Sequence, residues 1–383
     1  GGAALDPPDK RGTAYMMTGL LDEGAADLDS QAFASAREAL SASFSFDVSD
    51  DTLSISVRIL TENRAEALAL LKTALIKPRF DTEAVERVRQ QVLSILASNA
   101  QDPTDTAQRV WAEQAFGDHA YGASYQGTES SITALTRADL LAAHQNLLVR
   151  DAVSVSAVGD ITAEELGPIL DDLLGDLPAG SALESPPLEL DIPAGLTLVD
   201  ITTPQSVAIF GHRGIDRADP DFFAAFILNT ILGGNGIESR LTAEVREKRG
   251  LTYGISTVLL TKDHANVMLG QVASANDRIG AAIEVIRDEW SKLAHDGVTA
   301  EELQAAQTYL TGAYPLRFDG NSQIARILVG MQRQGLGLDY INTRNARIKA
   351  VTLSEINRVA ARLLQPEALN FVVAGQPTGL KEE

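Results

Sequence analysis

Apolar residues recur along this chain at two spacings, one typical of helices and one typical of strands. Helical spacing, with apolar positions three or four residues apart, covers 64–76 and 81–98. Strict alternation covers SFSFDVSDDTLSISVRIL, which predicts a hairpin with strands at 40–46 and 53–60. Because both spacings persist through the rest of the chain, we predict a protein of the α+β class.

Further elements follow the same spacings and begin at typical boundary residues. Asp102-Pro103 and Thr136 have the side chains that favour a helix start. We predict helices at 12–22, from 103, at 136–148, 163–174 and 278–294 and from 299, and strands at 153–158, 196–201, 206–212, 252–261, 265–274 and 369–374.

An internal duplication organises these elements into two halves. LTRADLLAAHQNLLVRDAVSVSAVGD (135–160) matches VTLSEINRVAARLLQPEALNFVVAGQ (351–376) without a gap, and FDTEAVERV matches VTAEELQAA at almost the same offset. Residues 177–193 hold four of the fourteen prolines and read as a linker. We therefore predict two similar domains, 1–176 and 194–383, each with an antiparallel or mixed sheet, helices on one face, and a cleft between the domains.

Composition excludes several classes of function. The formal charge of −20 argues against nucleic-acid binding. No apolar run approaches the roughly 20 residues of a membrane-spanning helix. The absence of Cys excludes disulfides and thiolate sites, and the five His residues include no pair four residues apart that could bind a metal from one helix.

The stretch from Asn229 to Ser256 carries the candidate chemistry. An apolar helix ends there in a Gly-rich turn, and a charged helix from about 238 to 248 follows and breaks at Gly250. From 251 the pattern is β, so Arg246 and Tyr253 flank the break and can face one cavity. A guanidinium and a phenol are hydrogen-bond donors suited to a carbonyl oxygen that gains negative charge.

This stretch resembles the pitrilysin/insulinase family of zinc peptidases, also called inverzincins. The resemblance rests on GG-x-G-x-x-SRL-x-x-x-VREKRGL-x-Y and extends over the whole chain from Gly12. It implies that Arg246 and Tyr253 bind the substrate backbone near the scissile bond. It assigns substrate binding also to the Gly-rich turn, formed by Gly233, Gly234, Asn235 and Gly236. In that family two strands precede the position of Gly1, so we expect a longer gene product.

The zinc motif of the family is absent at the aligned positions. Active members carry His-x-x-Glu-His on the first helix, where this chain has Tyr15, Thr18 and Gly19. The third ligand, a Glu, falls near Ser94 or Ile95, in a stretch without Asp or Glu. Hydroxyl groups and a glycine do not replace imidazole or carboxylate ligands of Zn²⁺. We expect no metal site and no peptidase activity in this chain alone.

The resemblance leaves two functions open. In the first, the chain is the non-catalytic subunit of a heterodimeric zinc metallopeptidase, and a paralogous subunit supplies the zinc while this one supplies Arg246 and Tyr253. In the second, it is a structural or binding subunit without a role in chemistry. A hydrolase that uses other residues has no support in the sequence. A homodimer is an alternative assembly, and peptides are the expected substrates. The periplasm is the expected compartment, with the cytoplasm as the alternative.

Overall fold

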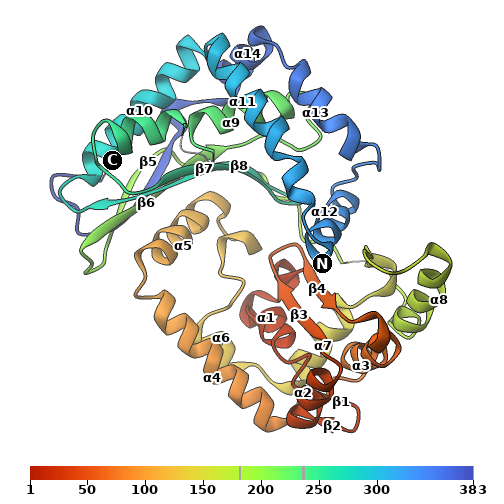
Figure 1. Ribbon diagram of the computed structural model, residues 1–383. Coiled ribbons are helices and arrows are strands. Elements are labelled where there is room, and N and C mark those ends of the chain that lie inside the picture. The colour runs from red at the N-terminus through yellow and green to blue at the C-terminus, as the bar shows by residue number, and fades with distance from the viewer. Residues whose placement is uncertain (181–182, 235–237, 383) are drawn as a thin grey trace. The chain divides into compact units, whose positions relative to one another are not determined.

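The computed structural model describes residues 1–180, 183–234 and 238–382 (Figure 1). These residues form two compact units that combine many helices with small sheets. Unit 1 comprises residues 1–98, 118–186 and 318–335, and unit 2 comprises residues 99–117, 187–317 and 336–383. The α+β class predicted from the sequence is confirmed.

The units differ from the predicted halves by two helices. Helix α5 (Pro103–Phe116) comes from the first half of the sequence and lies in unit 2. Helix α12 (Asn321–Arg333) comes from the second half and lies in unit 1. Each unit thus includes one helix from the other half of the sequence, which a boundary at a single linker does not capture.

Unit 2 is built on a five-stranded sheet. In spatial order its strands are β5 (Gly195–Asp200), β9 (Asn370–Gly375), β6 (Gln205–Arg213), β8 (Asn266–Ala275) and β7 (Ile255–Thr261). Strands β5 and β9 pair in parallel, and all other neighbours are antiparallel. The central strands β6 and β9 are buried along their length, which explains their continuous apolar sequences.

Helices cover one face of this sheet, as predicted. They are α9 (Phe222–Leu232), α10 (Ile279–Asp296), α11 (Ala300–Ala313), α13 (Tyr340–Ala350) and α14 (Leu353–Leu363). Helices α9 and α10 contact the strands, and the other three pack on them (Figure 1). On this face Phe210 stacks on Phe371 with ring centroids 5.3 Å apart and meets the edge of Trp290.

Helix α5 covers part of the opposite face. Successive residues of a strand point to opposite sides, so Gly211 faces away from the layer that contains Phe210. The ring of Trp111 on α5 lies there, and a Cβ on Gly211 would be 3.2 Å from it and 2.4 Å from the carbonyl oxygen of Met268. Only a glycine at this position allows α5 to approach β6 so closely.

Unit 1 consists mainly of helices. Its elements besides α12 are α1 (Thr13–Thr18), β1 (Gly24–Ala25), β2 (Leu28–Asp29), α2 (Ser30–Ala39), β3 (Ser43–Val48), β4 (Leu53–Arg58), α3 (Arg64–Ile76), α4 (Thr82–Asn99), α6 (Glu129–Ala134), α7 (Arg137–Leu147) and α8 (Ala163–Leu174). One apolar cluster joins α1, α4 and α7, and a second joins α2, α3 and the β3–β4 hairpin.

The internal duplication is visible in matching local structures. Thr136 caps α7 and Thr352 caps α14, each within a capping box closed by the acidic residue three positions later. At the other end of the repeat, Gly159 and Gly375 both have positive φ, 139° and 148°. These matches place the ungapped sequence repeat on equivalent structure in both units.

The repeat fails at one predicted strand. Residues 153–158 are extended, but within the described ranges they pair with no strand, whereas their counterpart β9 lies in the middle of a sheet. Alternation of apolar residues gives a segment the tendency to form a strand, and a strand also needs a neighbour to pair with. The prediction of a strand at 153–158 is therefore wrong for this structure.

Candidate functional site

Arg246 lies in the last turn of a helix whose end is firmly held. Residues Thr242–Glu247 form a π-helix, in which the N–H of Lys248 donates to the carbonyl oxygen of Ala243. π-Turns are rare and occur often at functional sites. Gly250, with φ of 61°, reverses the chain, and its N–H donates to the carbonyl oxygen of Arg246 at 2.9 Å. The backbone of Arg246 is thus fixed, and its side chain is exposed.

Of the three cations around this turn, one has no carboxylate partner among the described residues. Glu244 accepts hydrogen bonds from Lys248 at 2.5 Å and from Arg249 at 2.6 Å. These two cations lower the pKa of the Glu244 carboxyl to about 2. Within the described part of the chain, the Arg246 guanidinium has no such carboxylate partner. It is therefore the cation of this turn that stays available to a ligand.

Tyr253 lies in a bend two residues before β7, and not in the strand itself as the sequence pattern indicated. The hydroxyl of Thr252 explains the difference. It accepts from the N–H of Gly254 at 3.0 Å and bonds to the carbonyl oxygens of Gly254 and Ala273. The short spacing Thr-x-Gly is the sequence signal for such a turn. The bend turns the Tyr253 side chain outward, where it is 88% exposed.

The two predicted donors therefore share one property. Both sit on backbone that is fixed by hydrogen bonds to a helix end or to β8, and among the residues described neither side chain makes a hydrogen bond. A guanidinium and a phenol held in this way can donate to a carbonyl oxygen or a carboxylate of a bound chain. Within the described residues both groups are without hydrogen-bond partners, and their role remains a prediction.

The Gly-rich turn fastens α9 to the edge of β7. Gly233 and Gly234 both donate from their N–H groups to the carbonyl oxygen of Asn229, and the carbonyl oxygen of Gly233 accepts from Thr257 at 2.7 Å. A Cβ on Gly233 would lie 2.7 Å from the Thr257 hydroxyl oxygen. These two glycines thus serve close packing, and their predicted role in substrate binding remains untested.

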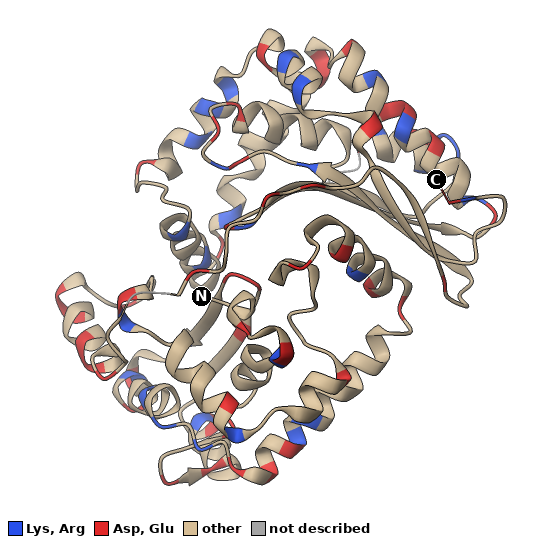
Figure 2. Ribbon diagram, turned by 180° about the vertical axis from the view of Figure 1, so that it is seen from behind, with Lys and Arg blue, Asp and Glu red and all other residues tan. Residues whose placement is uncertain are grey.

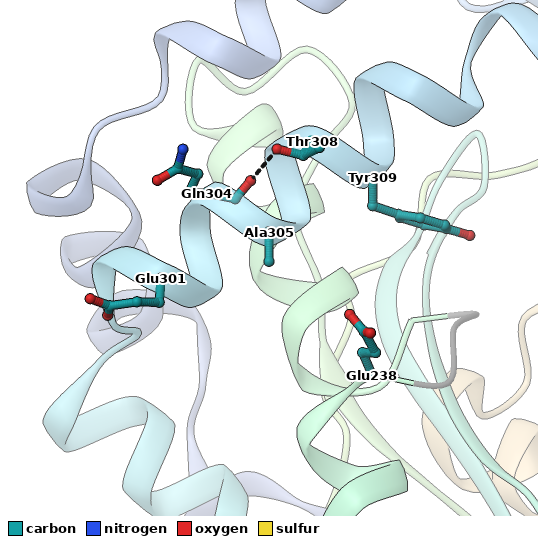
Figure 3. A pocket seen from close by; sticks show the side chains of 6 residues that line it. All are labelled: Glu238, Glu301, Gln304, Ala305, Thr308 and Tyr309. Carbon is teal, nitrogen blue, oxygen red and sulfur yellow. Dashed lines mark hydrogen bonds between the residues drawn. The ribbon is translucent and has the colours of Figure 1, made fainter.

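The other two residues of the predicted turn, Asn235 and Gly236, lie outside the described residues. An open groove of about 540 Å³ runs along α11. Its lining residues are Glu238, Glu301, Gln304, Ala305, Thr308 and Tyr309. Figure 3 shows the Glu238 carboxylate turned toward the helix and the Glu301 carboxylate turned away from the other lining residues. The two carboxylates do not converge on one point, so the groove shows no centre for chemistry.

The aligned metal positions in unit 1 offer no set of ligands. The Thr18 hydroxyl is buried and donates to the carbonyl oxygens of Ala14 and Tyr15, at 2.7 and 2.9 Å. It is therefore occupied within its own helix. Gly19 has no side chain, and Ser94 and Ile95 on α4 are exposed. Over the described residues, no group of three or more His, Cys, Asp or Glu side chains is placed to hold a metal ion.

Charge is spread over the helices of both units rather than gathered in one patch (Figure 2). The acidic side chains of helix α8 are exposed, and two of them, Glu165 and Asp172, pair with Arg64 and Lys72 of α3. In the described part of the chain no helix is long and apolar enough to cross a membrane.

Both halves of the chain match models of known protein families. Residues 1–129 match the family described as insulinase (peptidase family M16), and residues 134–310 match the peptidase M16 inactive domain. A relative from Helicobacter pylori, the "non-peptidase homolog YmxG", is 26% identical over 374 residues, which are 97% of this chain and 86% of that protein. An uncharacterized zinc protease of Mycobacterium tuberculosis is 29% identical over 303 residues, 78% of this chain and 69% of that protein.

Solved structures agree with this assignment. A "peptidase M16 inactive domain" from Pseudomonas fluorescens superposes with a TM-score of 0.93 at 27% identity, covering 99% of this chain and 91% of that one. A protease from Helicobacter pylori shares the fold, with a TM-score of 0.86 at 16% identity and coverage of 98% and 92%. The chain therefore belongs to the insulinase family of M16 peptidases, as an inactive member whose zinc-ligand positions hold Tyr15, Gly19 and Ser94 or Ile95.

Proposed function

We propose that this chain is the non-catalytic subunit of a heterodimeric zinc metallopeptidase. A zinc-bearing paralogous subunit would hold the metal and the general base. This chain would bind part of the peptide substrate and present Arg246 and Tyr253 to the carbonyl group under attack. The proposal includes a periplasmic location, in keeping with the expectation from the sequence.

One observation carries this proposal. The metal positions have lost every ligand, whereas the Arg246–Tyr253 turn keeps two donors exposed and without hydrogen-bond partners within the described residues. Glu244 pairs with Lys248 and Arg249 and leaves Arg246 without a carboxylate partner within the described residues, so the turn has positive charge to offer to a ligand that carries negative charge.

The chemical role follows from where charge develops during peptide hydrolysis. When water adds to the peptide carbonyl, its oxygen becomes negatively charged and is stabilised by donors that are already in place. A planar guanidinium can offer two parallel N–H groups, and a phenol offers one O–H.

The test is a peptide-cleavage assay on the reconstituted pair of subunits. Removing one preorganised donor typically lowers kcat by about 10²–10³, so we expect Tyr253→Phe to lower kcat far more than it raises KM. Arg246→Lys should not restore activity to an Arg246→Ala complex, because an ammonium group lacks the planar fork. Zinc content of the complex should stay unchanged in all three variants.

Matched controls come from the same unit. Arg213 is an exposed arginine on β6, and Tyr309 is a half-exposed tyrosine on α11, so Arg213→Ala and Tyr309→Phe remove similar groups elsewhere. Both controls should keep the wild-type rate. If Tyr253→Phe and Arg246→Ala complexes assemble and cleave peptides as fast as wild type, the turn is architectural and the chain is a structural subunit of the same fold.

A further inference from the structure

Guanidinium groups gather in unit 2 where helices α9 and α13 begin and helix α11 ends. These three helices pack against one another (Figure 1). The Cζ atom of Arg217, in the loop before α9, lies 5.7 Å from the centroid of the Phe223 ring, and that of Arg347 on α13 lies 6.0 Å from the same centroid. The Cζ atom of Arg344 lies 4.3 Å from the ring centroid of Tyr314, just after α11. Three cations thus share one aromatic cluster.

No carboxylate neutralises these cations in the described part of the chain. Arg217, Arg344 and Arg347 form no ion pair there. Two aspartates precede α9 in the same loop as Arg217, but Asp219 and Asp221 pair with arginines of α14. The negative charges of that loop are therefore already engaged, and the cluster keeps its positive charge.

Arg344 is the cation of this cluster that most needs a counter-ion, because its side chain is buried. It donates to the carbonyl oxygen of Leu310 at 3.2 Å and to the side-chain oxygen of Asn345 at 3.1 Å. The end of α11 supplies only about half a negative charge. Burial lowers the pKa of the Arg344 guanidinium, and the positive charge of Arg317 lowers it further. A buried charge without a counter-ion is costly, so a bound anion would stabilise this arrangement.

The hydroxyl group of Tyr340 marks where such an anion would bind. Its oxygen accepts a hydrogen bond from the Arg217 guanidinium at 2.7 Å, and the Arg344 guanidinium also interacts with it. Because the oxygen accepts, its hydrogen is left to donate, and no acceptor among the described residues takes it. The side chain of Tyr340 is half-buried and therefore reachable from solvent. An O–H donor beside two guanidinium groups is suited to an anion.

We propose that this Arg–Tyr cluster, formed by Arg217, Arg317, Arg344 and Tyr340, binds a phosphate group. The Tyr340 O–H donates to one phosphate oxygen, and the guanidinium groups of Arg217 and Arg344 donate to others. Arg317 is exposed and lies close enough to Arg344 to act on its pKa, so its long side chain closes over the bound anion from the solvent side.

Charge and geometry favour phosphate over a carboxylate as the ligand. A phosphate group carries a charge of about −1.5 to −2 at pH 7 and has at least three acceptor oxygens, so several donors can bind it at once. A carboxylate has one charge and two oxygens, and it would leave part of the cluster without a counter-ion. The formal charge of the chain is −20, which disfavours non-specific attraction of anions. Binding therefore depends on the local arginines.

Isothermal titration calorimetry of the full chain with inorganic phosphate, at pH 7.5 and constant ionic strength, tests the proposal. We expect one phosphate to bind per chain. Arg317→Gln and Tyr340→Phe should each weaken binding at least about tenfold, because each removes a donor to a charged group. The matched controls are Arg109→Gln, which removes an exposed arginine of α5 paired with Glu113, and Tyr309→Phe on α11. Both controls should bind phosphate as the wild type does.

Glycerol 3-phosphate in a parallel titration distinguishes free phosphate from a phosphate ester, and the tighter binder of the two identifies the source. The proposal is wrong if neither compound binds saturably, or if Arg317→Gln and Arg109→Gln bind equally well. It is also wrong if only a hexaglutamate peptide binds, because the cluster then recognises carboxylates. Arg317 is exposed, so this variant should fold even if Tyr340→Phe does not. The cluster shares no residue with the Arg246–Tyr253 turn, so the result is independent of peptide cleavage.

Discussion

Lowering the pH below about 6.5 should destabilise unit 2, because His212 is buried there in its neutral form. Its Nδ1–H donates to the carbonyl oxygen of Arg213 at 2.7 Å, and its Nε2 accepts from the Trp290 indole N–H at 3.0 Å. This arrangement is satisfied only by the tautomer with a proton on Nδ1. A second proton, on Nε2, would face the indole N–H of Trp290. Burial of the charged imidazolium adds to the free-energy cost of this protonation. Desolvation therefore lowers the pKa of His212.

The sign and size of the effect follow from proton linkage. The unfolded chain takes up a proton near pH 6.5, whereas the folded unit resists it until lower pH. The contribution of His212 is therefore fully present above pH 6.5 and is lost as the pH falls. While the folded form stays neutral, the loss between pH 8 and pH 5.5 amounts to about 1.4 kcal/mol.

Tryptophan fluorescence isolates this unit, because the chain has two Trp residues and both are buried in unit 2. Urea unfolding followed at pH 8, 6.5 and 5.5 should give a falling midpoint for the wild type. His212→Gln removes the titrating imidazole. Between pH 8 and pH 5.5 the urea midpoint of this variant should therefore fall less than that of the wild type, and the difference should correspond to about 1.4 kcal/mol. Trp290→Phe tests the hydrogen bond and leaves Trp111 as the probe; deleting one such bond costs about 1 kcal/mol. Identical pH dependence in wild type and His212→Gln would refute the reasoning.

Three further predictions concern stability. Thr136→Ala and Thr352→Ala each remove an N-cap, so each should destabilise its own unit by about 1 kcal/mol in urea titrations. Burial raises the pKa of Asp6 to about 6, so unit 1 should lose about 2 kcal/mol as the pH rises from 4 to 7, and Asp6→Asn should abolish that dependence in exchange measurements. Gly211→Ala should destabilise unit 2 by a few kcal/mol, because its Cβ meets the Met268 carbonyl oxygen and Trp111; a wild-type midpoint would contradict this.

Much of the fold could be predicted because local signals and tertiary packing agree. The prediction of a helix at 163–174 matches α8, and the cap residues Thr136 and Thr299 begin the helices they were expected to begin. Strands β6 and β9 were recognisable as short apolar runs because they are buried on both faces. In each case a local signal in the sequence, an apolar periodicity or a cap residue, is enough to define the element.

The failures concern features that depend on distant parts of the chain. The apolar alternation of 153–158 is intrinsic, but its pairing depends on a neighbouring strand. The placement of α5 on the sheet of unit 2 depends on Gly211, about a hundred residues away, and on the Asn370 side chain, which donates to Gln114 at 3.0 Å. Periodicity predicts which face of a helix or strand is apolar. It does not predict which unit contains the element that packs against this face.

The candidate site shows most clearly the difference between what a local sequence pattern predicts and what depends on the fold. The sequence places Arg246, Lys248 and Arg249 within four positions, and without the family resemblance it gives no means of ranking them. The structure ranks them, because Glu244 binds the second and third and leaves the first. An arginine with a structural role would be expected to bond to a helix end or a carboxylate. Since Arg246 does neither within the described residues, and Tyr253 is 88% exposed, both side chains are available for the ligand contacts that we propose.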